Sequence, residues 1–499
     1  MLRPRRRLVA PAHHRPKPGR AFGPPWPRFC LTLDLILAKE ALVHAPKQLS
    51  LGRRLARNDE GVSLIEVLVA MLIFAIVAVG VGYGLVTSLY LGNDARSRES
   101  AVNLAAQEID LARSAGNVFA VLESTSTVVQ NGTTFTLRRS TDWETTTGAD
   151  GNCGSGGGQL RYRRVNVTVT WDSMRATTPV VRADSALAPG SRINDPALGT
   201  ILVSVLTASG SGAAGVAISA APGVVPNGAA MLSEAPAATD AEGCSYLLKV
   251  QPGTYDVTVS RPNFVDKNQA TSGAQTVGVA AGGAASVAFA YDLAGTVTAH
   301  YGTNYSEGTT LLPNNLSTTF RSTYEPYVAV NPSNANVQTF RLHPFGYEVF
   351  AGRFIAATPS TPGCVSGDPA AWTTAAADGA IGIAAASIGM LPGGSATVDV
   401  PLGVLSVTGL AGQFLRAETT TAPTGSGDPG CAVATTYNFG QLPADATTQL
   451  GLPFGSWTFF SGAASGSETT PVPAANLAVL TRGVAAGGIV TLDPRAVTP

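Results

Sequence analysis

Residues 61–67 read GVSLIEV, and they lead into a run of 26 residues without a charge, Val67 to Gly92. That run exceeds the roughly 20 apolar residues that an α-helix needs to span a bilayer. Arg53, Arg54 and Arg57 stand just before it, so we expect the N-terminal side to stay in the cytoplasm. A secretory signal peptide would have a shorter apolar core followed by its cleavage site. Here the best cleavage candidate precedes the run, which predicts a retained membrane helix.

Residues 61–67 resemble the processing motif of type IV prepilins, in which a glycine is followed by an apolar or aromatic residue and by a glutamate five places on. The resemblance implies cleavage after Gly61 by a prepilin peptidase and N-methylation of the new terminal residue, Val62. Most family members have phenylalanine where this chain has valine. The implied leader, residues 1–61, is unusually long, and we favour a translation start further in, at Val43 or a nearby leucine.

Glu66 is the one carboxylate at the start of the apolar run. An unpaired charge in a membrane span costs about 2.5–3.5 kcal/mol on insertion scales. The free amine of Val62 on a neighbouring subunit would offset that cost, and the family resemblance implies that this pairing sets the register between pilin subunits. The alternative is a carboxylate that rests at the headgroup boundary without a partner.

The charge of the chain is divided unevenly around Gly61. Residues 1–61 carry 13 Lys and Arg against 4 Asp and Glu, whereas the remainder carries 20 against 29. A basic head before an apolar run indicates a membrane protein, and the acidic remainder argues against nucleic-acid binding. The chain also has 55 glycines and 33 prolines, which suits β-sandwiches with many turns better than helical bundles.

The helix is expected to continue past the membrane and to cover residues 62–116. Asp94 to Ala115 contains neither proline nor glycine, and it is rich in residues that favour helices. The predicted packing stripe is formed by Val102, Ala105, Ile109 and Ala112. The segment Asn103 to Ile109 resembles the soluble half of the helix in PilV-type minor pilins and type II secretion pseudopilins, in which this stripe packs on a small sheet.

A small antiparallel sheet is predicted over residues 117–185. Strands Ser126 to Gln130 and Thr133 to Arg139 flank Asn131-Gly132, which is a strong two-residue hairpin signal. Arg164 to Trp171 alternates strictly between polar and apolar residues, as a half-buried strand does. Residues 117–185 are therefore interpreted as the pilin-like β region.

Residues 186–199 are interpreted as a linker, and a second kind of domain follows over residues 200–294. Residues 239–243 read TDAEG, and residues 252–257 read PGTYDV. Together they resemble the turn and strand of transthyretin-like sandwiches of the carboxypeptidase-regulatory and CnaB type. A CnaB isopeptide bond needs a lysine in the first strand, and this chain has none there.

The rest of the chain is expected to be β-rich. Residues 452–459 echo the proline, glycine and aromatic pattern of residues 251–259, which predicts another sandwich over 401–499. Residues 295–400 form a β-rich region whose fold the sequence leaves open. The predicted fold class is thus an α+β pilin-like N-terminal part, a long helix on a small antiparallel sheet, followed by all-β sandwich domains.

Four cysteines remain once the leader with Cys30 is removed: Cys153, Cys244, Cys364 and Cys431. An even number suits an exported protein, and four cysteines allow three connectivities. We favour a Cys364–Cys431 bridge, because both residues follow Pro-Gly in loop-like surroundings. A bridge over that span would contribute ~4 kcal/mol. Metal binding is not expected, because the chain has no CxxC and few histidines.

These features predict a minor pilin-like subunit of a type IV pilus, made as a single-pass precursor in the cytoplasmic membrane and then displayed at the cell surface. Its expected partners are the prepilin peptidase, other pilin subunits, the inner membrane and a surface ligand. The alternatives are a type II secretion pseudopilin, a membrane-anchored surface protein and a surface hydrolase built from Asp and Glu. No catalytic motif is present, so we expect no enzyme, no metal and no cofactor.

Overall fold

The computed structural model describes residues 63–496 except 147–149, 152, 154–157, 173, 176–177, 191–192, 226, 332 and 361–362. Gly61 and Val62, the predicted processing residues, lie outside the described part. The chain divides into two compact units, residues 1–80 and 81–499. Helix α1, Leu64–Ser114, contributes residues to both units.

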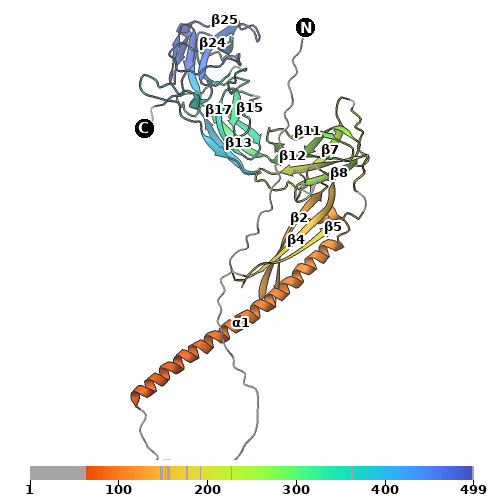
Figure 1. Cartoon of the computed structure of the whole chain (residues 1–499). Coiled ribbons are helices and arrows are strands. Elements are labelled where there is room, and N and C mark those ends of the chain that lie inside the picture. The colour runs from red at the N-terminus through yellow and green to blue at the C-terminus, as the bar shows by residue number, and fades with distance from the viewer. Residues whose placement is uncertain are drawn as a thin grey trace, which may run out of the picture. The chain divides into compact units, whose positions relative to one another are not determined.

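The C-terminal half of α1 packs on a sheet (Figure 1). The helix side chains that are buried there are Ala101, Leu104, Ala105, Ile109 and Ala112. The predicted stripe is therefore wrong at Val102, which is 51% exposed. Ala101 takes its place, because it lies four residues, about one turn, before Ala105 in a helix with 3.6 residues per turn. Leu104 lies three residues after Ala101 and widens the buried face.

The sheet behind α1 is antiparallel in the order β1-β2-β4-β5, with β3 on β2. Its strands are β1 Ser124–Gln130, β2 Thr133–Thr145, β3 Asp150–Gly151, β4 Leu160–Trp171 and β5 Val181–Leu187, and the short helix η1, Val118–Ala120, precedes them. Asn131 and Gly132 both have positive φ, 52° and 77°, as a type I′ hairpin requires. We call the C-terminal half of α1 together with residues 117–187 the head.

Two sheets form a first sandwich after the head. Its strands are β6 Gly199–Leu206, β7 Ala217–Pro222, β8 Cys244–Val250, β9 Gly253–Ser260, β10 Phe264–Asp266, β11 Ser272–Val279 and β12 Ala284–Leu293. The sheets have the orders β10-β12-β6-β8 and β11-β9-β7. The first strand, β6, runs parallel to the last strand, β12, whereas the other pairs are antiparallel.

The region whose fold the sequence left open is a second sandwich on the same plan. Its elements are β13 Gly295–Tyr301, β14 Ser317–Arg321, β15 Tyr327–Val330, β16 Val337–Leu342, β17 Gly346–Ala351, η2 Pro369–Ala371, β18 Ser387–Gly389 and β19 Ser395–Val400. Its sheets have the orders β16-β13-β19 and β15-β14-β17-β18. Again the first strand pairs in parallel with the last, β13 with β19.

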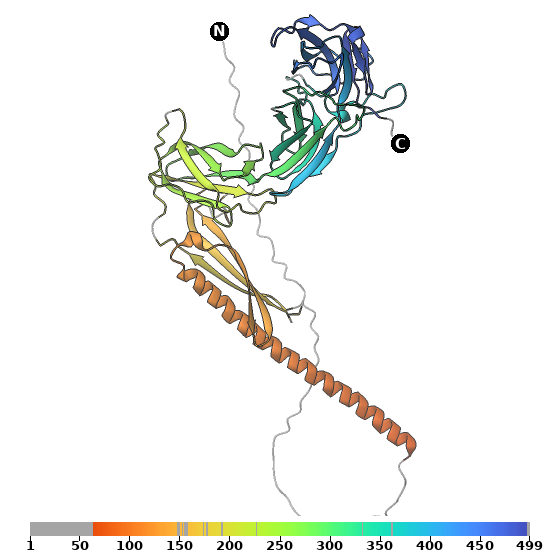
Figure 2. The same cartoon turned by 180° about the vertical axis from the view of Figure 1, so that it is seen from behind.

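A third sandwich completes the described chain (Figure 2). Its elements are β20 Gly403–Thr408, β21 Phe414–Thr419, β22 Thr436–Gln441, β23 Thr447–Leu452, β24 Gly455–Gly462, β25 Thr470–Pro471, η3 Ala474–Asn476, β26 Leu477–Val479, β27 Gly483–Ala486 and β28 Ile489–Leu492. The sheets have the orders β23-β20-β26 and β22-β21-β24-β28-β27, with β25 on β24. Buried residues from Val297 to Leu492 form one cluster, so the second and third sandwiches share a hydrophobic core.

An aromatic residue near the start of one strand recurs in the three sandwiches. The hydroxyl of Tyr255 in β9 donates to the carbonyl oxygen of Gln251 at 3.0 Å. Tyr347 in β17 donates to the carbonyl of His343 at 2.7 Å, and Trp457 in β24 donates through Nε1 to that of Pro453 at 3.0 Å. Each ring thus fills the core and also bonds back to the backbone four residues earlier. The fold class predicted from the sequence, a pilin-like helix and sheet followed by β-sandwiches, is confirmed; the domain boundaries stay predictions.

Candidate assembly and docking sites

The N-terminal half of α1 exposes apolar side chains on all its sides. Leu64, Phe74 and Tyr83 are 78%, 75% and 75% exposed. A surface helix of a globular domain hides one apolar face, whereas a helix that is apolar all round spans a membrane or packs among other helices. Within the described residues, α1 is the helix that is long and apolar enough to cross a bilayer. It is therefore the candidate site for anchoring and assembly.

Glu66 lies in the first turn of α1 and is exposed. Its backbone N–H donates to the carbonyl oxygen of Ser63 at 2.9 Å. A carboxylate at this end of a helix is favoured by the helix dipole, but the described residues around it offer no cation to its side chain. The role of Glu66 in assembly stays a prediction.

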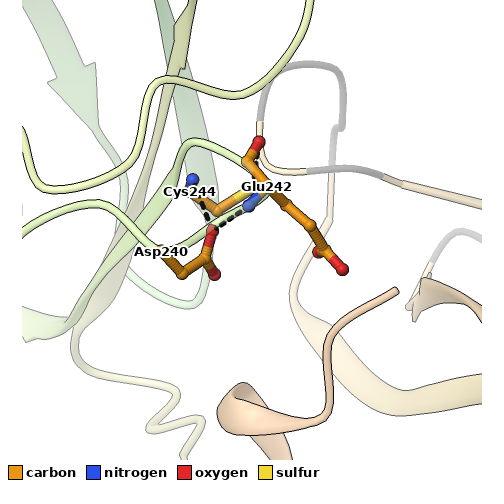
Figure 3. Close-up of side chains that lie close together, drawn as sticks. All are labelled: Asp240, Glu242 and Cys244. Atoms are coloured by element: carbon orange, nitrogen blue, oxygen red, sulfur yellow. Dashed lines mark hydrogen bonds between the residues drawn. The ribbon is translucent and has the colours of Figure 1, made fainter. Parts of the chain in front are cut away.

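Two carboxylates and a cysteine lie close together where a turn leads into β8 (Figure 3). Asp240, Glu242 and Cys244 bring their potential ligand atoms within 4.8 Å of one another. Asp240 Oδ1 accepts hydrogen bonds from the backbone N–H groups of Glu242 and Cys244, both at 2.9 Å. Burial raises the pKa of Asp240, although these two hydrogen bonds act in the opposite direction. Asp240 thus holds the turn in shape.

The other two members of the cluster are committed elsewhere. Cys244 forms a disulfide with Cys153 of the head, and the carboxylate of Glu242 pairs with Arg163 in β4. In Figure 3 that carboxylate points away from Asp240. A thiol held in a disulfide is not a metal ligand, so the arrangement fits a joint between the head and the first sandwich.

The ion pair of this joint is buried on the side of the head. Arg163 Nη2 lies 2.6 Å from Glu242 Oε2, and the arginine side chain is 1% exposed against 22% for the glutamate. The same nitrogen donates to Thr141 Oγ1 at 2.7 Å. Glu242 Oε1 accepts from the backbone N–H of Glu123 at 2.5 Å. A charge as deeply buried as Arg163 needs a partner of opposite sign, and the first sandwich supplies it.

Apolar contacts surround the ion pair. The indole N–H of Trp143 in β2 donates to the hydroxyl of Tyr246 in β8 at 3.1 Å. The rings of Phe119 and Tyr246 lie 4.8 Å apart. Leu202 of β6 is itself a buried member of the head's hydrophobic cluster, and Leu248 packs against it. The turn and strand β8 of the first sandwich therefore close the core of the head.

Alkaline pH should weaken this joint. Burial raises the pKa of Tyr246 to about 12, whereas the pKa of tyrosine in an unfolded chain is ~10. The folded state holds the proton, so this stabilisation is fully present below about pH 10 and is lost as the pH rises through about 12. Urea melts over this range should show a smaller loss for Tyr246→Phe than for the parent chain. Tyr324→Phe, at a side chain that is 44% exposed, is the control, and equal losses in all three would contradict the expectation.

The structure contains two disulfides among its described cysteines, Cys153–Cys244 and Cys364–Cys431. The second is the bridge that the sequence favoured. Neither lies within one sandwich. Cys364 follows β17 of the second sandwich, and Cys431 lies between β21 and β22 of the third.

Arg163 and its joint with Glu242 were missed at the sequence level. The two residues stand 79 positions apart, and Arg163 lies in a strand that reads as an ordinary alternating one. The available signal was Glu242 itself, a carboxylate inside a turn that already has Asp240 to cap it. The asparagine side chains Asn304 and Asn315 carry no signal in the sequence. They hydrogen-bond to the backbone of the third sandwich, at Leu402 and at Thr436 and Asn438.

Comparisons with known proteins identify the N-terminal motif. Residues 56–82 match the family model described as the prokaryotic N-terminal methylation motif. No curated protein matches the chain. Among solved structures, the Bacillus anthracis TIE protein is 11% identical over 70% of this chain and 69% of its own, with a TM-score of 0.18.

Two further solved structures are pilins. A streptococcal ancillary pilin is 8% identical over 47% of this chain and 75% of its own, with a TM-score of 0.18. The major pilin subunit of Bacillus cereus is 8% identical over 53% and 87%, with a TM-score of 0.15. Such low TM-scores carry no conclusion about this chain. The methylation motif is informative, because it runs directly into the apolar helix. The chain therefore carries a prokaryotic N-terminal methylation motif, a long apolar helix and a β-rich body, which is consistent with a type IV pilin-like protein.

Proposed function

We propose that the chain is a minor pilin-like subunit of a type IV pilus. A prepilin peptidase would remove the leader after Gly61, and α1 would anchor the precursor in the membrane and then pack among other pilin helices. The observation that carries the proposal is the methylation motif at 56–82, followed by a helix with apolar side chains exposed on all sides. The sandwiches behind the head would be displayed for assembly or adhesion, and we propose no enzymatic activity.

A type II secretion pseudopilin would carry the same motif and helix. Three sandwiches, from Gly199 to Leu492, follow the head. Pseudopilins rarely carry several hundred additional residues, so the size of this part favours the pilus. Genes for a pilus ATPase beside this one would support the pilus. Genes for a secretion outer-membrane ring would instead support the pseudopilin.

Replacing Glu66 tests whether the chain assembles through α1. Glu66→Ala should leave processing and membrane insertion intact but lower the amount of the protein in sheared fibres about tenfold, since a lost pairing worth about 1.4 kcal/mol changes an equilibrium by that factor. Quantitative immunoblots of the fibre and membrane fractions measure this ratio. Glu99→Ala, at another exposed carboxylate of α1, is the matched control. Equal recovery of Glu66→Ala and the parent chain in fibres would show that the carboxylate has no part in assembly.

A further inference from the structure

Each of the two disulfides joins two neighbouring parts of the fold. Cys153–Cys244 connects the head to the first sandwich and spans 91 residues. Cys364–Cys431 connects the second sandwich to the third and spans 67 residues. A disulfide placed inside one sandwich would stabilise that sandwich alone. These bridges instead hold two neighbouring parts of the fold together, so a pulling force can pass from one part to the next through a covalent bond.

The segments between the bridged cysteines contain strands from the middle of their sheets. Between Cys153 and Cys244 lie β4, which is flanked by β2 and β5, and β6, which is flanked by β12 and β8. Between Cys364 and Cys431 lie β20 and β21, which are flanked on both sides in the third sandwich. A pulling force that reaches Cys153 passes through the sulfur atoms to Cys244 and leaves β4 and β6 without tension. The same holds for β20 and β21.

The junction between the first and second sandwiches is held differently. Gln269 accepts a hydrogen bond at Oε1 from the backbone N–H of His343 at 2.6 Å and donates through Nε2 to the hydroxyl of Tyr347 at 3.1 Å. Arg341 Nη1 donates to Asn263 Oδ1 at 3.1 Å. Among the described cysteines none spans this junction. It is therefore the junction that tension can open without breaking a covalent bond.

We propose that the two disulfides are tension clamps, which keep the strands between the bridged cysteines, β4, β6, β20 and β21 among them, free of tension when the displayed end of the subunit is pulled. The proposal rests on the pilus function, because a fibre subunit is held by α1 at one end and carries its ligand at the other. It adds a mechanical role to that function. Tension would extend the residues outside the two bridged segments, and the residues between Cys153 and Cys244 and between Cys364 and Cys431 would bear no tension.

Stretching the full chain by its two ends in detergent, one molecule at a time, tests the clamps. At roughly 3.3–3.6 Å per extended residue, the Cys153–Cys244 bridge hides about 310 Å of chain, and the Cys364–Cys431 bridge hides about 230 Å. Reductant should therefore lengthen the fully extended parent chain by about 540 Å.

Paired substitutions separate the two bridges. Without reductant, Cys153→Ser with Cys244→Ser should gain only the longer increment, and Cys364→Ser with Cys431→Ser only the shorter one. Cys30→Ser, in the predicted leader, is the control and should change nothing. The proposal is overturned if reductant leaves the length unchanged, or if the increments match a different pairing of the four cysteines. It is also overturned if the oxidised parent chain lengthens by either increment before reductant is added. No fibre is needed, so the result is independent of the Glu66 experiment.

Discussion

Glu242→Gln should lower the free energy of unfolding of the head and first sandwich by about 3–5 kcal/mol, the range measured when one partner of a buried ion pair is removed. The exchange keeps the size of the side chain and removes its charge. Arg163, which is 1% exposed, then remains buried with hydroxyl and carbonyl partners only. Because Glu242 itself is 22% exposed, we expect the lower end of that range. Urea melts of the oxidised full chain at neutral pH measure the change.

Glu234→Gln is the matched control for this prediction. Glu234 is an exposed carboxylate in the loop that leads to the same turn, and its substitution should change stability by no more than about 0.5 kcal/mol. Combining Glu242→Leu with Arg163→Met should recover much of the loss, because replacing both partners of a buried pair by apolar groups is often close to neutral. Equal stability of Glu242→Gln and the control would mean that the ion pair does not hold the joint.

The elements with strong local signals were predictable from the sequence. The uncharged run predicts α1, and Asn131-Gly132 predicts the hairpin that joins β1 and β2, which the register from Gln130 opposite Thr133 confirms. The alternation of residues 164–171 predicts β4, whose Val165, Val167 and Val169 are fully buried. In each case the deciding information lies within a few neighbouring residues.

The fold of the second sandwich was not predictable from a single motif, although a signal was present. Residues 344–347 read PFGY, which matches PFG at 453–455 and the aromatic that follows. The turn before β16 lacks the TDxxG pattern that precedes β8 in the first sandwich. The 35 residues between β17 and β18, 352–386, contain only short η2 among their described parts, which hides the sandwich spacing.

The contacts between the head and the first sandwich could not be predicted from the sequence, for a physical reason. A buried ion pair such as Arg163 with Glu242 depends on the mutual approach of two folded surfaces, and neither residue stands out within its own strand or turn. The sequence led us to interpret residues 186–199 as a linker. In the structure Ile193 is buried in the head's cluster, and the side chain of Asn194 donates to the carbonyl of Leu160 at 2.5 Å. These contacts tie part of the predicted linker to the head, and no local pattern in the sequence indicates them.

Blocking the predicted cleavage should have the largest effect on the protein. Gly61→Ala should slow or block cleavage, because the prepilin motif that residues 61–67 resemble has glycine before the cut. The uncleaved leader would keep Val62 from offering a free amine to Glu66. Gly52→Ala, at a leader glycine outside the motif, should be processed like the parent chain. Gel mobility of the membrane fraction separates precursor from mature protein, and equal processing of the two variants would remove Gly61 from the site.

Mass spectrometry of the N-terminus of the mature protein tests most directly whether the chain is processed as a prepilin. The N-terminal peptide is expected to begin at Val62 and to carry one methyl group on its amine. A chain that keeps residues 1–61 in cells with an active prepilin peptidase, or one that is cut after the apolar run instead of before it, would contradict the account.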